Sequence, residues 1–245
     1  MLTLRSLAFD VLFLVTTALI LIIGSPLLLG PRWAAMEGLK FHARWCLWLM
    51  RVVAGTKVEV RGRENLPQGA ALVASKHQSA WETFALIPLF ADPAMVMKDE
   101  LKWIPLYGWF SLKFEHILVK RQRGPAALRQ LIGEARAKAV QGREIVIFPE
   151  GTRQAVDAPP SYKSGVLALY EGLELPCVPV ALNSGLFWPR GSWMRYPGTI
   201  VIDVMAPIPP RLPREDFRQR LEADIETGTA RLVAEARAAS AELAA

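Results

Sequence analysis

The stretch AALVASKHQSAWET, residues 70–83, decides the fold class because an apolar strand pattern leads directly into a helical one. Residues 70–75 form a short, unbroken apolar run, which is typical of a strand buried on both faces. A helical pattern follows over residues 79–91. Strands that alternate with helices in this way indicate an α/β domain.

The same alternation runs through the chain from residue 56 onward. Strands are predicted at residues 56–62, 70–75, 94–98, 116–120, 144–148, 177–183 and 199–205. Helices are predicted at residues 79–91, 124–142 and 164–174, and a polar, Ala-rich helix is predicted after Pro213. We therefore expect an α/β fold in which a mixed, largely parallel sheet is flanked by helices. Ligands of such sheets bind at the carboxyl ends of the strands.

The amino-terminal part of the chain is strongly apolar and carries only two charges before residue 32, Arg5 and Asp10. Its core, VLFLVTTALILIIGSPLLLG at residues 11–30, is long enough to cross a bilayer, which takes roughly 20 residues. We therefore predict an N-terminal membrane helix. Gly24 and Pro26 leave a re-entrant segment open in place of a full span. A cleaved signal peptide is the competing interpretation, although its apolar stretch is usually shorter.

A second helix is predicted over GLKFHARWCLWLMRVVAG, residues 38–55, with charged side chains on one face. Either it lies flat among lipid headgroups or it packs on the domain as an ordinary amphipathic helix. Basic residues after the apolar run predict that the body of the protein is cytoplasmic. The chain is thus divided into a membrane segment with an amphipathic helix at 1–55 and an α/β domain at 56–245.

The chain of 245 residues suits one sizeable domain with an appended segment. Its formal net charge of +6 favours anionic partners, namely nucleic acid, an anionic membrane surface or a phosphorylated substrate. No nucleic-acid-binding motif is recognised, so that class is not expected. Cys46 and Cys177 lie far apart without metal-ligand spacing, and neither a disulfide nor a metal site is expected. Serine-hydrolase and nucleotide-binding motifs are also missing.

Candidate site residues follow the ends of predicted strands. His77 comes after the strand at 70–75, and FPEGTR at 148–153 ends the strand at 144–148. In FPEGTR, the glycine can adopt φ > 0, and the arginine offers a bidentate fork that suits phosphate. Glu82 stands five positions after His77. It either orients the imidazole or only caps a helix, because residues 79–82 fit the S-x-x-E capping box.

Four blocks, HQSAWE, GWFSLKFEHILVKR, VIFPEGTR and LPCVPVALNSG, resemble in order and spacing the motif blocks of the glycerolipid acyltransferase family. Among its members, the chain is most similar to bacterial 1-acyl-sn-glycerol-3-phosphate acyltransferases, over roughly residues 56–210. The resemblance implies transfer of a fatty acyl group from acyl-CoA or acyl carrier protein to the free hydroxyl of lysophosphatidic acid, giving phosphatidic acid for phospholipid synthesis. It implies no cofactor beyond that thioester substrate, and a bacterial inner (cytoplasmic) membrane location with the catalytic domain facing the cytoplasm.

The resemblance also implies roles for individual residues. His77 would be the catalytic base, with Glu82 as its orienting partner where the family's first block, H-x-x-x-x-D, has aspartate. Contacts with the acceptor substrate are implied for Lys98, Arg121, Glu150, Gly151, Thr152, Arg153 and Lys163. Two other functions remain open at this stage. In the first, the chain is an acyltransferase that uses another lyso-lipid as the acceptor. In the second, it is a non-catalytic, membrane-attached protein that binds lipid phosphates.

Overall fold

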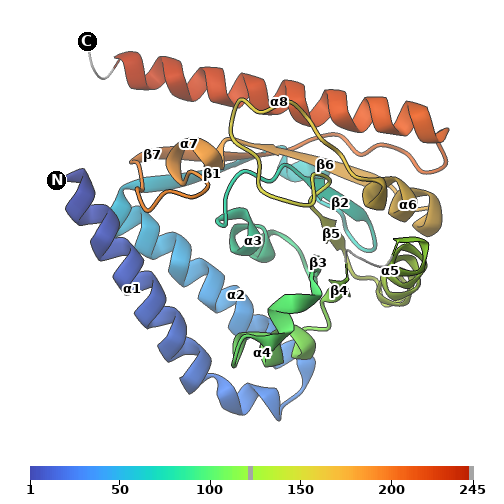
Figure 1. Ribbon diagram of the computed structural model, residues 1–245, viewed down its shortest axis with the longest axis horizontal. Helices are drawn as coiled ribbons and strands as arrows, with labels where there is room; N and C mark the ends of the chain where they lie inside the picture. Colours follow the sequence, from blue (N-terminus) through green and yellow to red (C-terminus); the bar gives the residue numbers. More distant parts are fainter. Residues whose placement is uncertain (121–123, 243–245) are drawn as a thin grey trace.

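The computed structural model describes residues 1–120 and 124–242, and within them it has a seven-stranded sheet with the order β1-β7-β6-β2-β5-β3-β4 (Figure 1). The strands are β1 (Thr56–Arg61), β2 (Leu72–Ser75), β3 (Ala94–Lys98), β4 (Ile117–Val119), β5 (Ile145–Ile147), β6 (Cys177–Leu182) and β7 (Gly198–Val204). All seven predicted strands are therefore confirmed, each to within two residues at either end.

The strands run mostly in one direction. Within the sheet just described, only β6 and β7 pair in antiparallel fashion, whereas the other neighbours are parallel. The prediction of a mixed, largely parallel sheet is thus confirmed. As a consequence, the carboxyl ends of β2, β3, β4, β5 and β6 meet at one edge of the sheet, where a ligand site is expected.

Helices cover both faces of the sheet. The helices α5 (Gly124–Ala139), α6 (Ser164–Leu173) and α8 (Arg214–Glu242) pack with Leu72 and Ile145 in one buried cluster. On the other face, α1 (Leu2–Ile23), α2 (Arg32–Leu49) and α3 (Glu82–Ala85) pack with Val73 and Val146. Figure 1 shows α8 on one side of the sheet and the hairpin of α1 and α2 on the other. The unbroken apolar runs reflect this burial on both faces.

Some helices differ from the sequence prediction. The helix expected at 79–91 is reduced to α3 and a 3-10 turn at Ile87–Leu89, because Pro88 lacks an N–H and cannot continue an α-helix. Two short helices were not predicted, α4 (Tyr107–Lys113) and α7 (Ser184–Phe187), and the same holds for the 3-10 turn at Asp99–Trp103. The helices expected at 124–142, 164–174 and after Pro213 are confirmed by α5, α6 and α8.

The amino-terminal helix α1 is long and apolar enough to cross a membrane by length and composition. It nevertheless lies along the domain. Phe9 is fully buried, and the carboxylate of Asp10 lies 2.9 Å from the guanidinium of Arg195. Near the other end of the helix, Leu21 packs in a cluster with Phe110 of α4. The helix α1 therefore contacts the domain at both of these places.

The first 55 residues share a core with the α/β domain. Cys46 and Leu49 of α2 are buried in the same cluster as Val73 of β2, so α2 packs on the domain as an amphipathic helix. Its other face stays open, with Trp33 and Trp48 exposed. The boundary at residue 55 therefore marks a change of sequence pattern inside one packed structure.

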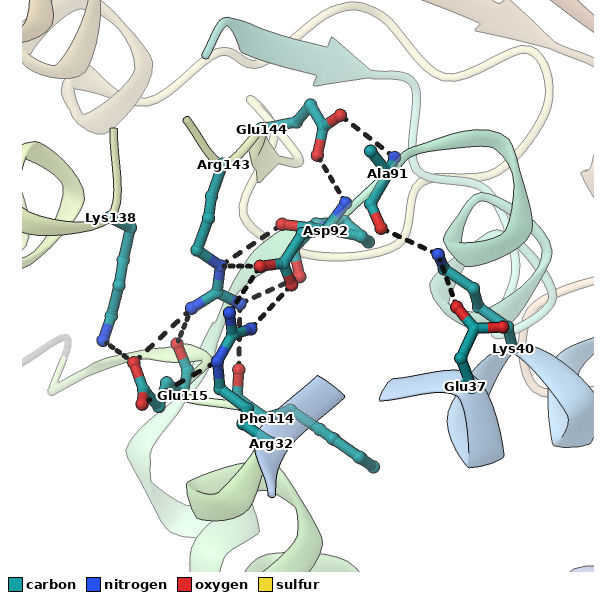
Figure 2. A network of polar contacts seen from close by, with 11 residues as sticks. Arg32, Glu37, Lys40, Ala91, Asp92, Phe114, Glu115, Lys138, Arg143 and Glu144 are labelled. Atoms are coloured by element: carbon teal, nitrogen blue, oxygen red, sulfur yellow. Dashed lines mark hydrogen bonds and ion pairs between the residues drawn. The ribbon is translucent and has the colours of Figure 1, made fainter. Parts of the chain in front are cut away.

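A polar network joins α2 to the amino-terminal ends of β3, β4 and β5, at the edge opposite His77 (Figure 2). Arg32, in the first turn of α2, donates two hydrogen bonds to Asp92 at 2.7 and 2.6 Å. Arg143, whose side chain is fully buried, binds the carbonyl oxygens of Asp92 and Phe114. This network fixes the helical hairpin to the sheet at a second place, far from the candidate site.

Candidate active site

His77 follows β2, and only one of its two ring nitrogens has a hydrogen-bond partner among the described residues. Its Nδ1 lies 2.9 Å from Oε1 of Glu82, and its ring stacks on Phe148 with centroids 4.1 Å apart. The side chain is 13% exposed. Over residues 1–120 and 124–242, no hydrogen bond to Nε2 is found. The imidazole is therefore oriented through Nδ1, while Nε2 stays available.

Glu82 is fully buried and serves two purposes with one carboxylate. Besides His77, its Oε1 accepts the backbone N–H groups of Gln78 at 2.6 Å and Ser79 at 2.7 Å. In a capping box, the Ser79 hydroxyl would accept the N–H of Glu82. Here it accepts the N–H of Trp81, one residue earlier. The two alternatives for Glu82 are thus compatible, because the oxygen that caps the chain also binds the imidazole.

Ser184, which sequence reasoning did not single out, completes the environment of Glu82. Its hydroxyl donates to Oε2 at 2.8 Å, and both side chains are buried. Next to it, the N–H of Gly185 donates to the side chain of Gln78. Ser184 belongs to the block LPCVPVALNSG and begins α7 two residues after the end of β6, so its place near a strand end was the available signal.

The FPEGTR loop after β5 is bound to the backbone of His77 on both sides. The N–H of His77 donates to Oε2 of Glu150 at 2.9 Å, and the N–H of Gln154 donates to the carbonyl of His77 at 2.8 Å. Gly151 has φ of 65°, as predicted for the turn. Its N–H donates to the carbonyl of Phe148. The loop and the histidine are therefore held in one fixed arrangement.

Glu150 differs from the role expected for it. Rather than facing an acceptor, its carboxylate is buried and lies 2.7 Å from the ammonium of Lys76. Burial raises the pKa of the Glu150 carboxyl, although the charge of Lys76 and the N–H of His77 act in the opposite direction. In this position, Glu150 binds the backbone N–H of His77 and not its ring.

The predicted cations share the edge of the sheet with His77. Arg153 is exposed in the FPEGTR loop beside the half-buried Thr152, and Lys98 is exposed at the end of β3. Lys163 is exposed at the start of α6, where its N–H binds the carbonyl of Pro149. The fourth cation, Arg121, lies outside the described residues. Three described cations thus lie at the edge of the sheet that also carries His77.

Comparison with known proteins identifies the family. A model of the Acyltransferase family matches residues 57–183, which include His77, Glu82 and the FPEGTR loop. This chain belongs to the acyltransferase family. The acyltransferase match ends just before Ser184 and does not reach α8.

Individual acyltransferases show how far the similarity extends. The chain is 41% identical over 161 residues to a 1-acyl-sn-glycerol-3-phosphate acyltransferase of Pseudomonas aeruginosa, covering 64% of this chain and 63% of that protein. It is 33% identical over 110 residues to a lyso-ornithine lipid O-acyltransferase of the same organism, covering 44% and 40%. The chain therefore covers less than two thirds of these relatives.

The fold also has a solved counterpart. The crystal structure of a 1-acyl-sn-glycerophosphate (LPA) acyltransferase from Thermotoga maritima matches with a TM-score of 0.78 and 24% sequence identity. The match covers 95% of this chain and 98% of that protein. It thus includes the amino-terminal helices and α8, which lie outside the family match.

Proposed function

We propose that this acyltransferase moves a fatty acyl group from an acyl thioester to the free hydroxyl of 1-acyl-sn-glycerol-3-phosphate. One observation carries the proposal. Glu82 binds Nδ1 of His77 and leaves Nε2 open, at the sheet edge where Arg153 is exposed. A base placed beside a cation is what attack by the hydroxyl of a phosphate-bearing acceptor requires. The names of the relatives support the same choice of acceptor.

The reaction needs no covalent enzyme intermediate. When the Nδ1–H group donates a hydrogen bond to Glu82, the neutral imidazole carries a lone pair at Nε2. That atom accepts the hydroxyl proton as the acceptor oxygen attacks the thioester carbonyl. The tetrahedral intermediate then expels the thiolate, and the imidazolium gives the thiolate the proton that it took from the acceptor hydroxyl. Throughout, the carboxylate of Glu82 stabilises the imidazolium, as carboxylates do in catalytic triads.

Recognition of the acceptor is assigned to the cations at the same edge. Arg153 is the first choice, because a guanidinium binds phosphate oxygens in a bidentate manner and its loop is attached to the His77 backbone through Gln154. Lys98 and Lys163 offer further positive charge, and Arg121 keeps its expected phosphate contact as part of the proposal. Positioning of two bound substrates then supplies much of the rate.

The amino-terminal hairpin is proposed to hold the enzyme at the membrane. The outer face of α1 exposes large apolar side chains, including Leu4, Val15 and Ile23. Tryptophans of α2 and α4 are exposed as well, and this residue type favours the membrane interface. We expect α1 to lie in one leaflet, with the active site facing the cytoplasm of a bacterial inner membrane. The donor is acyl-CoA or acyl carrier protein.

A second candidate acceptor is a lyso-lipid without a phosphomonoester. The 33% identity to a lyso-ornithine lipid O-acyltransferase favours this alternative. The two candidates differ in what the exposed cations are for, because a dianionic phosphate needs them and an ornithine headgroup does not. Discrimination between acceptors therefore distinguishes the two functions.

Acyl transfer by the detergent-purified protein tests the proposal. Wild type and His77→Ala are assayed with 1-acyl-glycerol-3-phosphate, lyso-ornithine lipid and lysophosphatidylcholine, each with acyl-CoA and acyl carrier protein donors. We expect turnover with the first acceptor, and a loss of at least ~10²-fold in His77→Ala, as is typical of a missing general base. Turnover only with another lyso-lipid supports the second candidate. Lipid-phosphate binding without turnover would show a non-catalytic protein.

A further inference from the structure

Lys76, directly before His77, is a lysine with a side chain only 1% exposed. Its ammonium lies 2.7 Å from Oε1 of Glu150 and donates to both carboxylate oxygens of Glu226 in α8, at 2.8 and 2.9 Å. A buried ammonium is costly unless its donors are satisfied. Here two of its donors bind the Glu226 oxygens, and the Glu150 carboxylate adds an ion pair at 2.7 Å.

The far side of this cluster is also fixed. The hydroxyl of Tyr162 donates to Oε1 of Glu226 at 2.9 Å. Burial and the charge of Glu226 raise the pKa of Tyr162, so its hydroxyl remains a donor. Glu226 thus has two partners within the domain, although its own side chain is 25% exposed. The carboxylate of α8 is therefore a stable anchor for Lys76.

The near side of the cluster reaches the candidate base. Glu150 receives Lys76 on one oxygen, and its other oxygen accepts the backbone N–H of His77 at 2.9 Å. Lys76 and His77 follow β2, and their side chains diverge, because Lys76 contacts Glu226 of α8 while His77 contacts Glu82. A continuous series of contacts under 3 Å therefore leads from α8 to the His77 peptide.

We infer that Lys76 is a positioning residue for His77. Its ammonium holds the Glu150 carboxylate against the His77 peptide, and Glu226 anchors the ammonium to α8. This inference rests on the proposed acyl transfer, since it assigns to Lys76 an effect on the base of that reaction. It also gives α8, which lies beyond the family match, a part in the active site. Without the ammonium, the buried carboxylate of Glu150 would face the partly exposed carboxylate of Glu226, and Glu150 would turn or become protonated.

Kinetics of Lys76→Met provide the first test. Methionine keeps much of the length and removes the charge. A displacement of the base by a fraction of an ångström should lower kcat by between ~10- and ~100-fold. The acceptor KM should stay within about twofold, because Lys76 is sealed from the acceptor side and the cations that bind phosphate are unchanged. Unchanged kcat in a folded Lys76→Met protein would overturn the inference.

A double-mutant cycle shows whether Lys76 acts through Glu150. Glu150→Gln removes the charge and keeps a carbonyl oxygen for the His77 N–H. In that background Lys76→Met should cost little further kcat, because the two residues belong to one chain of contacts. Independent, multiplicative losses would contradict the inference. Asp203→Asn is the matched control, since it breaks the ion pair of Arg231 that joins α8 to β7 elsewhere.

A spectroscopic readout does not depend on turnover. The chain has three histidines, so selective ¹⁵N-histidine labelling gives three backbone amide signals, and His77→Gln assigns one of them. Lys76→Met should shift the His77 amide, and Asp203→Asn should leave it in place. If Lys76→Met does not fold, Glu226→Ala replaces it, with a smaller shift expected. An unmoved signal in the variant used would refute the inference. A wild type that is inactive with every acceptor, yet shows the shift, would refute the proposed function alone.

Discussion

The hydroxyl of Ser184 donates a hydrogen bond of 2.8 Å to Oε2 of Glu82, and the two residues lie 102 positions apart in the sequence. Hydrogen bonds to charged groups contribute about 1.5–3 kcal/mol. Ser184→Ala should therefore lower kcat by roughly tenfold, since each 1.4 kcal/mol is a factor of ten, and leave the acceptor KM unchanged. Steady-state kinetics measure this. Ser111→Ala is the control, because Ser111 is equally buried but binds the carbonyl of Tyr107 in α4.

Glu82→Gln separates the two purposes of the carboxylate. Glutamine keeps an oxygen for the N–H groups of Gln78 and Ser79 but cannot stabilise an imidazolium by charge. We expect a folded protein with kcat reduced by about 10²-fold, on the scale of general-base catalysis. Circular dichroism and acyl transfer are measured together. Activity close to wild type would show that Glu82 only caps the chain before α3.

Glu82→Ala extends the comparison to stability. It leaves the buried N–H groups of Gln78 and Ser79 without their acceptor, and each such loss costs about 1–3 kcal/mol. The alanine variant should therefore be clearly less stable than the glutamine variant in denaturant unfolding. Equal stability of the two would remove the capping contribution.

Arg153→Ala should raise the acceptor KM more than it lowers kcat, because a phosphate contact made equally in ground and transition states affects binding alone. The measurement is a titration of 1-acyl-glycerol-3-phosphate at saturating donor. Arg190→Ala is the control. Arg190 is an exposed arginine nearby, and its guanidinium donates to the carbonyl of Arg153. If the KM stays the same, Arg153 does not contact the acceptor.

Asp92→Asn should weaken the network of Figure 2 and reduce the pH dependence of the protein's folding stability. Burial acts to raise the pKa of Asp92, but its bonds with Arg32 and the charge of Arg143 outweigh burial and lower it. A carboxyl with a lowered folded pKa stabilises the protein above its unfolded pKa of about 3.9, and this stability is lost as pH falls through the folded value. The variant should lose about 3 kcal/mol at pH 6 and respond less to acid below about pH 4.

Unfolding in urea at several pH values checks that expectation. Asp157→Asn is a suitable control, because its partner Arg237 is exposed and such surface pairs contribute little. A wild-type stability that does not fall more steeply than that of Asp92→Asn below pH 4 would contradict the assignment.

The orientation of α1 can be tested by cysteine labelling. Leu4 lies near the start of α1, and Leu29 lies in the turn between α1 and α2. Both are exposed. If α1 lies in one leaflet, Leu4→Cys and Leu29→Cys should react with a membrane-impermeant maleimide from the same side of sealed vesicles. The native Cys46 and Cys177 are buried and provide a low background. Labelling from opposite sides would establish a full span.

Six of the strands could be predicted because they are compact, mostly apolar runs, and β1 because its residues alternate in period two. Their order in the sheet could not, since β7 inserts between β1 and β6 through pairings that no local pattern encodes. The helix α4 escaped prediction for a physical reason. Trp109 and Leu112 are exposed on it, so its apolar residues do not follow one buried face.

At the candidate site, the sequence predicts residues that are close in the chain or carried by a motif. His77 and Glu82 stand within one block, and their hydrogen bond could be anticipated. Ser184 and Glu226 could not be, because they reach the site from α7 and from α8 across 102 and 150 residues. The inward turn of Glu150 was also hidden, since nothing in FPEGTR indicates that Lys76 would need a buried partner.

The attachment of α1 limits how freely protein engineers could exchange it. Asp10 pairs with Arg195, whose guanidinium also lies over the ring of Trp188, and Phe9 meets the same ring at 5.4 Å. A chimaera that replaces residues 1–31 with an unrelated hydrophobic helix would still reach the membrane. It would nevertheless leave the buried Arg195 without its carboxylate and Trp188 without its aromatic neighbour. The helix is thus matched to its own catalytic domain and is not a portable anchor.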